Sequence, residues 1–593
     1  MDRQEIIYEI NGPVIYIKGK TSLSMGEMVF VGQSRLVGEV ILLEAEMTTI
    51  QVYEETTGLR PGDPVWGSGQ PIYVTLGPGI LDNIFDGIER PLARIAEESG
   101  MYIQRGISVS SLDTEKKWDV KMVLKEGQYV VGGEILAETP ETPGIVHRAL
   151  VPPKVKGTVT YVAPDGEYTV EDVIARVRTS HGEEEELKLA HRWPIRAARP
   201  CGNRFVSSIP LVTGQRILDT LFPIAKGGTA AIPGGFGTGK TMNQHQIAKW
   251  ADADIIIYIG CGERGNEMTE VLEDFSKLVD PRSGNPMMKR TCLIANVSNM
   301  PVAAREASIY TGITLAEYYR DMGYHVAVMA DSTSRWAEAL RELSGRLEEM
   351  PAEEGFPAYL ASRLSGFYER AGYVQALNGR EGSVSIIGAV SPQGGDFSEP
   401  VTQNTKRFVR CFWGLDRALA YARHFPAINW LNSYSEYVGD LAPWYARNVD
   451  RKFVTYRNQI VTILNDESSL MEIVKLIGSD VLPDDQKLTL EIARVIRVGF
   501  LQQNAFHPDD TCVPLKKQYL MMKTILYLYD KCKALVAASI PVSIIRKEEI
   551  FEKVCSMKFD IKNDELDKFE TYLDSIDQFY DKVLKEQGKT DVD

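Results

Sequence analysis

Gly234-Gly-Phe-Gly-Thr-Gly-Lys-Thr241 is the stretch that decides the fold of this chain. It fits the pattern G-x-x-x-x-G-K-[ST] at every fixed position. Glycine-rich backbone of this kind turns its N–H groups inward, toward a polyphosphate at the start of a helix. Apolar residues 230–232 precede the stretch as the end of a strand would, and helix-compatible residues 242–250 follow it. The pattern therefore predicts a phosphate-binding loop between a strand and a helix.

Each residue of this loop has an expected role in binding ATP. Lys240 would reach the β- and γ-phosphates, and the Thr241 hydroxyl would bind Mg²⁺. The alternative is an accidental glycine-rich turn, which the fitting strand and helix on either side argue against. The predicted ATP-binding residues of the loop are Gly234, Gly235, Phe236, Gly237, Thr238, Gly239, Lys240 and Thr241.

Length and composition set limits on the class of protein. The chain has 593 residues, which predicts three to four domains. Its 66 basic and 81 acidic residues give a net charge of −15, which argues against binding to nucleic acid. No apolar run approaches the ~20 residues of a membrane span. No signal peptide is recognisable in the first residues, and the seven cysteines lack metal-ligand spacing. We expect a cytoplasmic protein that reaches a membrane only through other subunits.

Five segments with different patterns follow one another, and together they predict a multidomain fold. Short β-branched runs separated by Gly, Pro and Asn indicate β-structure, alternating strand-like and helix-like runs indicate an α/β domain, and apolar residues at helical spacing indicate helices. The segments are an N-terminal β-barrel (1–75), a connection into the nucleotide domain (76–115), a β-rich, barrel-sandwich-like bulge insertion (116–190), a central α/β P-loop (RecA-like) domain with a mostly parallel sheet (191–435), and an all-helical C-terminal domain (436–593).

The bulge insertion has the strand–turn–strand rhythm of the lipoyl and biotinyl carrier domains, clearest in residues 125–136. A carrier needs a lysine at an exposed hairpin tip, and Lys121-Met122 is a poor substitute for one. We therefore interpret the insertion as a structural or docking module.

Asp331 is the candidate metal-side carboxylate. It ends the apolar run His325-Val-Ala-Val-Met-Ala-Asp331, and a carboxylate at a strand end can hold Mg²⁺ directly or through water. The alternative is an aspartate that caps the helix after Ser332. The phosphate loop upstream makes us favour the metal role.

Glu263 is the candidate general base for the attacking water. It follows a second apolar strand, residues 254–260, within the glycine-rich segment Cys261-Gly-Glu-Arg-Gly-Asn-Glu267. Arg264 beside it would contact the γ-phosphate or position Glu263, and Glu267 is either a helper or a helix-terminal acid. The alternative is an inert surface Glu–Arg pair.

A nucleotide base also needs a slot, for which the sequence offers two aromatic residues. Phe425 precedes Pro426, and Phe506 lies far downstream in Gln503-Asn-Ala-Phe-His-Pro508. Taken singly, each phenylalanine is more often a core residue than a ligand contact.

Four motifs together resemble one family, the catalytic A subunits of the V-type and archaeal-type rotary ATPases. They are the loop 234–241, Gly260–Glu267, Ala330–Trp336 and Ser391–Pro400. The resemblance covers essentially the whole chain, and the order of barrel, bulge, nucleotide domain and helical domain also fits. The bulge distinguishes this family from the shorter F-type β subunits.

The resemblance implies a set of roles and partners. Three A subunits would alternate with three noncatalytic B subunits in a ring, and B would supply an arginine finger in trans. Central-shaft and peripheral-stalk subunits would connect the ring to a membrane sector that moves H⁺ or Na⁺. In this chain the implied roles are Glu263 as the base, Lys240 and Arg264 as phosphate ligands, Thr241 and Asp331 on the metal side, and Phe425 and Phe506 as the adenine slot. Thr238 stands where many vacuolar relatives have a cysteine, so a thiol switch in the loop is not expected.

Two other classes of protein remain open. A noncatalytic, regulatory ring subunit would keep the architecture but usually lacks the complete loop and the glutamate, whereas this chain has Lys240, Thr241 and Glu263. A hexameric ATPase that translocates protein or nucleic acid shares the core, but the bulge and the acidic charge count against it.

Overall fold

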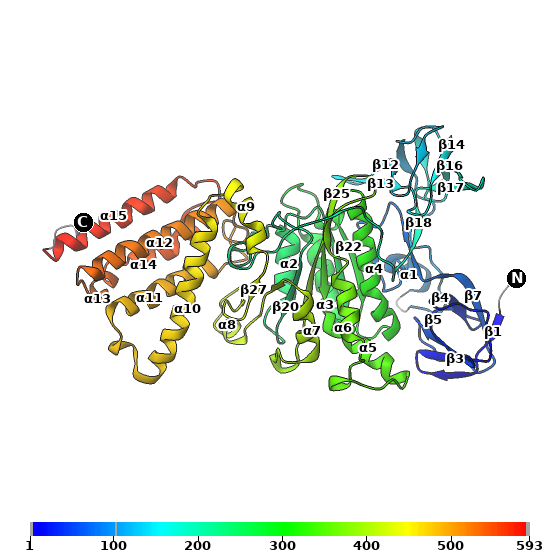
Figure 1. The fold of residues 1–593 in the computed structure, drawn as a ribbon, viewed down its shortest axis with the longest axis horizontal. Helices are drawn as coiled ribbons and strands as arrows, with labels where there is room; N and C mark the ends of the chain where they lie inside the picture. The colour runs from blue at the N-terminus through cyan, green and yellow to red at the C-terminus, as the bar shows by residue number, and fades with distance from the viewer. Residues whose placement is uncertain (1–3, 101–102, 589–593) are drawn as a thin grey trace. The chain divides into compact units, whose positions relative to one another are not determined.

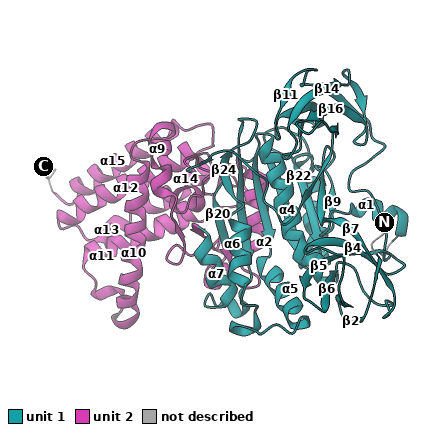
Figure 2. Ribbon diagram, turned by 45° about the vertical axis from the view of Figure 1, so that its right-hand side comes forward, with its two compact units in different colours: residues 1–206, 226–231, 253–409 teal, residues 207–225, 232–252, 410–593 magenta. Residues whose placement is uncertain are grey.

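A computed structural model describes residues 4–100 and 103–588, in two compact units. The first unit comprises residues 1–206, 226–231 and 253–409, and the second comprises 207–225, 232–252 and 410–593 (Figure 2). Three of the predicted segments, 1–75, 76–115 and 436–593, contain residues that lie outside the described part of the chain, namely 1–3, 101–102 and 589–593.

The first unit begins with an antiparallel barrel sheet, drawn in blue in Figure 1. Its strand order is β1-β7-β4-β5-β6-β3-β2. Alternate residues of β4, such as Val29 and Val31, are fully buried in the same core as Ile50 of β6. This alternation is what one buried face of a sheet requires. The strands are β1 (Gln4–Ile6), β2 (Glu9–Asn11), β3 (Val14–Lys18), β4 (Glu27–Val31), β5 (Leu36–Leu43), β6 (Met47–Val52) and β7 (Pro64–Pro71).

The bulge consists of two four-stranded sheets, ordered β13-β12-β10-β15 and β11-β14-β16-β17. It is inserted between β8 (Tyr73–Leu76) and β18 (His191–Pro194), which pair antiparallel and bring its two ends together. Helix α1 (Leu92–Ser99) precedes it. Its strands are β10 (Trp118–Met122), β11 (Tyr129–Val130), β12 (Ile135–Thr142), β13 (Ile145–Leu150), β14 (Gly157–Val162), β15 (Gly166–Tyr168), β16 (Val173–Thr179) and β17 (Glu184–Lys188).

A buried polar cluster attaches the bulge to helix α4 (Val302–Asp321). Glu141 of β12 accepts hydrogen bonds from the Tyr319 hydroxyl at 2.8 Å and 3.0 Å, and it lies 2.9 Å from Nδ1 of His147. Nε2 of His147 lies 3.0 Å from the Tyr318 hydroxyl. Because buried polar groups are costly unless they are paired, this cluster fixes where the bulge sits on α4.

The α/β part of the first unit has a parallel sheet ordered β25-β23-β21-β22-β9. Helix α4 packs across it (Figure 1), closely enough that a Cβ on Gly312 would lie 2.3 Å from the side chain of Ile259. Edge strands β24 (Gly372–Gln375) and β19 (Arg204–Phe205) are antiparallel. The parallel strands are β9 (Ile84–Phe85), β21 (Ile255–Cys261), β22 (Thr291–Asn296), β23 (His325–Asp331) and β25 (Glu381–Val390). The remaining helical segments are α3 (Gly265–Lys277), η2 (Met287–Arg290), α5 (Thr333–Arg346), η3 (Glu353–Gly355), α6 (Leu360–Tyr368), η4 (Gln393–Gly395) and α7 (Pro400–Phe408).

Strand β20 (Thr229–Pro233) begins in the first unit and ends in the second. Just before it, the carbonyl of Gly228 accepts a 3.0 Å hydrogen bond from the N–H of Ile386 in β25. Its last residues lead into the loop 234–241 and helix α2 (Lys240–Trp250). The strand–loop–helix order expected around the glycine-rich stretch is therefore present.

The rest of the second unit is mainly helical. The rings of Tyr445 in α9 and Phe453 in α10 stack at 4.2 Å, and α12 packs against both α10 and α15. Beside the helices lies the short antiparallel pair β26 (Cys411–Phe412) and β27 (Tyr434–Ser435). The helical segments are η1 (Ile217–Leu221), α8 (Arg417–Tyr421), α9 (Val438–Asn448), α10 (Phe453–Ile477), η5 (Ser479–Val481), α11 (Asp484–Val495), η6 (Ile496–Leu501), α12 (Leu515–Ala537), α13 (Val542–Arg546), α14 (Ile550–Asp560) and α15 (Lys568–Glu586).

The predicted fold class is confirmed, since barrel, bulge, parallel α/β sheet and C-terminal helices occur in the expected order. Among residues 4–100 and 103–588, no helix has the length and apolar character needed to cross a membrane.

Candidate functional site

The loop 234–241 has the geometry of a phosphate cradle. Gly237 and Gly239 adopt φ angles of 77° and 88°, which side chains other than glycine rarely tolerate, and α2 starts directly after Gly239. The ammonium of Lys240 donates to the carbonyls of Gly234 at 2.7 Å and Gly235 at 3.2 Å. The loop therefore curls around its own lysine at a helix N-terminus, where an anion is favoured.

Two further side chains shape this loop. The Thr238 side chain is buried, and its hydroxyl donates to the Gly235 carbonyl at 2.7 Å. A Cβ on Gly235 would lie 2.6 Å from Nε of Arg417, so the guanidinium of Arg417 occupies the space beside the loop. Sequence reasoning missed Arg417, because an arginine at the start of a short helix belongs to no motif. Its position adds a positive charge next to the cradle.

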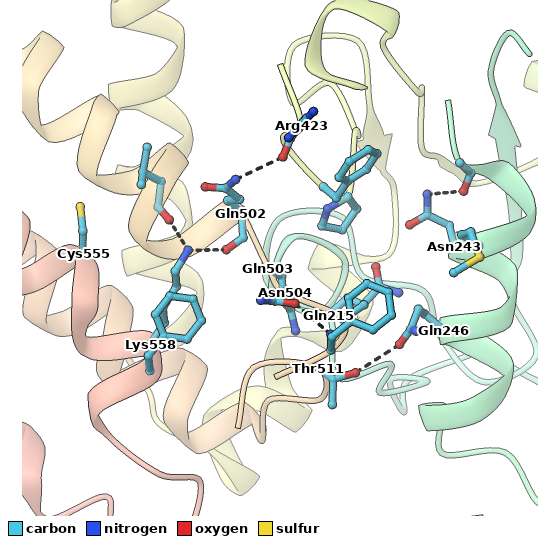
Figure 3. A pocket seen from close by; sticks show the side chains of 18 of the residues that line it. Gln215, Asn243, Gln246, Arg423, Gln502, Gln503, Asn504, Thr511, Cys555 and Lys558 are labelled. Atoms are coloured by element: carbon cyan, nitrogen blue, oxygen red, sulfur yellow. Dashed lines mark hydrogen bonds between the residues drawn. The ribbon is translucent and has the colours of Figure 1, made fainter. Parts of the chain in front are cut away.

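A cavity of about 840 Å³ opens in the second unit beside the loop (Figure 3). Phe425 and Phe506 both line it, together with Gly239, Met242 and Asn243 from the loop end and first turn of α2. Both phenylalanines are exposed to solvent, so neither is a core residue. Two aromatic rings that line one cavity next to a phosphate cradle are suited to holding a planar base.

Gln503 fixes the segment that carries Phe506. Its side-chain oxygen accepts from the N–H of Arg216 at 2.9 Å, and its amide donates to the carbonyls of Gly214 at 2.9 Å and Asp510 at 2.7 Å. The side chain is buried, and all its partners belong to the second unit. Sequence reasoning missed this residue, because a glutamine in a loop carries no signal of burial.

In the first unit, β21 and β23 lie side by side and bring their carboxyl ends to one edge of the sheet, with Gly260 opposite Asp331. Asp331 is buried and accepts a 3.1 Å hydrogen bond from the Tyr258 hydroxyl. Burial raises the pKa of Glu263 to about 8, helped by the charge of Asp331 and a hydrogen bond with Glu267. Three predicted carboxylates thus gather at this edge.

Two arginines accompany these acids. The charge of Arg335 in α5 lowers the pKa of Glu263 in part, and Arg335 pairs with Glu338 at 2.8 Å. Arg264 is exposed at the start of α3. Burial and the neighbouring carboxylates raise the pKa of Glu263 more than Arg335 lowers it, so negative charge at this edge is only partly compensated. A further cation would therefore be favoured there. The Asp331 carboxylate and the Thr241 hydroxyl are hard oxygen donors of the kind that Mg²⁺ prefers.

The structure therefore places the predicted residues in two groups. Lys240, Thr241, Phe425 and Phe506 belong to the second unit, around one cavity and its loop. Glu263, Arg264 and Asp331 belong to the first unit, at the carboxyl edge of the parallel sheet.

Family profiles match most of the chain in four consecutive blocks. Residues 7–69 match the β-barrel domain of the ATP synthase alpha/beta family, and residues 109–196 match the ATP synthase alpha/beta subunit barrel-sandwich domain. Residues 214–435 match the nucleotide-binding domain of the same family, and residues 442–543 match the C-terminal domain of V and A type ATP synthase.

Whole-length relatives and a solved structure agree with these profiles. The chain is 58% identical to the V-type ATP synthase alpha chain of Halothermothrix orenii, over 98% of this chain and 99% of that one. It is 56% identical to the A subunit of the A-type ATP synthase of Methanopyrus kandleri, over 98% of both chains. The assembled type III secretion ATPase EscN of enteropathogenic E. coli superposes with a TM-score of 0.62, covering 88% of this chain and 99% of that one, and at 20% identity it shows the fold alone. The chain therefore belongs to the ATP synthase alpha/beta family, among the V-type and A-type alpha (or A) subunits.

Proposed function

We propose that this chain hydrolyses ATP in the catalytic ring of a V-type or A-type rotary ATPase. The observation that carries the proposal is the loop closed around Lys240 beside a cavity with two aromatic rings, in a chain that aligns end to end with subunits of that class. The loop supplies the anion site, and the cavity supplies the base site. A subunit that binds no nucleotide would need neither.

Each predicted site residue would have a separate role in phosphoryl transfer. On phosphate binding, the Lys240 ammonium would exchange the carbonyls of Gly234 and Gly235 for the β- and γ-phosphate oxygens. Thr241 and Asp331 would hold Mg²⁺, which neutralises charge on the phosphates when bound. Deprotonated Glu263 would accept a hydrogen bond from the attacking water and orient it, and Arg264 would contact the γ-phosphate. The adenine would lie between Phe425 and Phe506.

The partners of this reaction are also proposed. Three copies of this chain would alternate with three noncatalytic B subunits, each of which supplies an arginine finger to the site. Central-shaft and peripheral-stalk subunits would transmit rotation to a membrane sector that moves H⁺ or Na⁺. The chain would then be a cytoplasmic protein held at the membrane by other subunits.

The deciding experiment is an ATPase assay on the chain with and without its ring partner, in Mg²⁺ and without any polymer. We expect hydrolysis that requires the partner and is lost in Lys240→Ala. Nucleotide binding without hydrolysis in the assembled ring would indicate a noncatalytic subunit. Activity that requires added nucleic acid or secreted protein would indicate a polymer-translocating ATPase instead.

A further inference from the structure

Five large apolar side chains are exposed toward the same cavity in the second unit. Phe506 is 92% exposed, Met242 49%, Phe425 44%, Phe559 38% and Val498 37%, and all five line the cavity. Scattered exposed apolar residues are ordinary, but a group that converges on one cavity marks a ligand site.

An adenine base accounts for only part of this lining. Phe425 and Phe506 would contact its faces, and Met242 lies next to the loop that holds the phosphates. Val498 of η6 and Phe559 of α14 lie on the wall contributed by the C-terminal helices, with Cys555 beside them. We call the part of the cavity lined by Val498, Cys555 and Phe559 the distal compartment. Neither the phosphates nor the ribose would contact it.

The chemistry of the nucleotide determines which atoms would face the distal compartment. The ribose is attached at N9 of the purine, and in the proposed function the phosphate end would lie at Gly239 and the start of α2. The six-membered ring, with N1 and the amino group on C6, is the edge farthest from N9. A base held between Phe425 and Phe506 therefore directs this edge away from α2, toward the wall formed by η6 and α14.

The polar groups at this wall are already engaged. The Lys558 ammonium donates to the carbonyls of Val498 at 2.7 Å and Gln502 at 3.1 Å, and Arg494 pairs with Glu552 at 2.8 Å. The Lys558 bonds join α14 to η6 and the residue after it, and the Arg494–Glu552 pair joins α14 to α11. Arg494 and Glu552 neutralise each other, and the Lys558 ammonium is bonded to backbone carbonyls, so the compartment itself is lined by the apolar side chains of Val498 and Phe559 and by the Cys555 thiol. A neutral apolar group suits this lining.

We propose that the distal compartment is a specificity subsite that accepts an apolar substituent carried on the C6 amino group of an adenine nucleotide. This proposal rests on the proposed function, since it uses the same base slot. The cavity volume of about 840 Å³ lies at the upper part of the range for sites that enclose drug-sized ligands, so an aryl group fits beyond the base.

The test compares N6-benzyl-ATP with ATP as substrates of the purified complex that contains this chain and its ring partners. We expect kcat/KM for N6-benzyl-ATP to lie within about tenfold of the value for ATP. Val498→Trp fills the distal compartment. It should therefore lower the ratio of kcat/KM for N6-benzyl-ATP to kcat/KM for ATP by about tenfold or more. Cys555→Phe, which fills the compartment from α14 instead of η6, should lower the same ratio. The matched control is Val481→Trp, since Val481 is 67% exposed in η5 and does not line the cavity.

The outcomes separate this proposal from the proposed function. If the complex hydrolyses ATP, but N6-benzyl-ATP is neither hydrolysed nor competes with ATP, the subsite is overturned and the proposed function stays intact. Equal ratios in the wild type, Val498→Trp and Cys555→Phe would also overturn it. If the complex hydrolyses no ATP, calorimetric titration of the full chain with ADP and with N6-benzyl-ADP still tests the subsite. Comparable affinities for the two nucleotides in the wild type, with weaker binding of N6-benzyl-ADP than of ADP in Val498→Trp, would support it. Binding of ADP without binding of N6-benzyl-ADP would overturn it.

Discussion

The backbone N–H of Gln503 donates a 2.8 Å hydrogen bond to the carbonyl oxygen of Phe425. This bond joins the turn that carries one aromatic ring of the cavity to the segment that carries the other, Phe506. The side chain of the same glutamine is bonded to Arg216, Gly214 and Asp510. One buried residue therefore connects both walls of the base slot to the body of the second unit.

We expect Gln503→Leu to raise KM for ATP more than it lowers kcat. The substitution removes the partner of the Arg216 N–H and of the Asp510 carbonyl, while the Gly214 carbonyl keeps the N–H of Val513. Leaving buried polar groups unpaired costs about 1–3 kcal/mol. The loosened segment would hold Phe506 less firmly, while the groups that act on the γ-phosphate remain. Steady-state kinetics of the assembled complex check this. Gln587→Leu, at an exposed position just after helix α15, is the control, and an equal loss of kcat with unchanged KM would contradict the role given to Gln503.

Glu263→Gln should retain nucleotide binding and lose hydrolysis. The amide keeps the shape of the side chain but has no carboxylate to orient water, and general bases contribute about 10²–10⁴-fold to rate. Nucleotide binding by calorimetry and turnover by phosphate release measure the two effects separately. Glu270→Gln on the exposed face of α3 is a matched control. An active Glu263→Gln complex would remove the assignment of Glu263 as the base.

Local patterns predicted the parts of the site that depend on a short stretch of chain. The loop around Lys240 and the strand end at Asp331 each follow from residues adjacent in sequence, and the structure has a strand and a helix where these patterns require them. Their functional roles stay predictions.

The rest depends on contacts between distant segments, which one sequence does not specify. Val498 and Phe559 lie on helices whose apolar spacing indicates only that one face is buried. Which exposed apolar residue faces the cavity is decided by how η6 and α14 pack. The position of Arg417 beside Gly235 likewise depends on a contact between segments far apart in the sequence. The second aromatic, Phe506, was identified mainly through the family resemblance for the same reason.

Acid should release the bulge from helix α4 through Glu141. Burial alone would raise the pKa of Glu141, but the imidazole of His147 and hydrogen bonds from His147, Leu81 and Tyr319 outweigh it and hold the pKa below its usual 4.5. A lowered folded-state pKa means that the stabilisation is complete above about pH 4.5 and is lost as the pH falls through the folded-state value. Glu141→Gln should therefore have a free energy of unfolding about 3 kcal/mol lower than that of the wild type at pH 7, with a lower melting temperature. The difference between the two proteins should be smaller at pH 4.

The control for that comparison is Glu138→Gln, on the same strand but with a partly exposed carboxylate paired to Arg148. We expect a small difference from the wild type at both pH values, because exposed pairs contribute little. A gap for Glu141→Gln that stays constant between pH 7 and pH 4 would contradict the role of its charge.

Lys558 gives a pH dependence of the same sign in the second unit, but at alkaline pH. Burial, together with the nearby guanidinium of Arg216, lowers the pKa of Lys558 from its usual 10.5 to about 8. Between those values the unfolded chain holds a proton that the folded chain has released, so rising pH favours the folded state. Lys558→Met should be less stable than the wild type by about 1–3 kcal/mol, since the Val498 carbonyl loses its bond from the ammonium and the Gln502 carbonyl keeps only its bond from Arg216.

Because methionine does not titrate, the deficit of Lys558→Met relative to the wild type should widen from pH 7 to pH 9. Melting temperatures of the two proteins at both pH values measure this difference. Lys516→Met, an exposed lysine of α12, should differ from the wild type by the same small amount at both. If the stability difference between Lys558→Met and the wild type became smaller as the pH rises, the prediction would be contradicted. The folded protein would then stabilise the charged form of Lys558, and the wall of the distal compartment would depend on that positive charge.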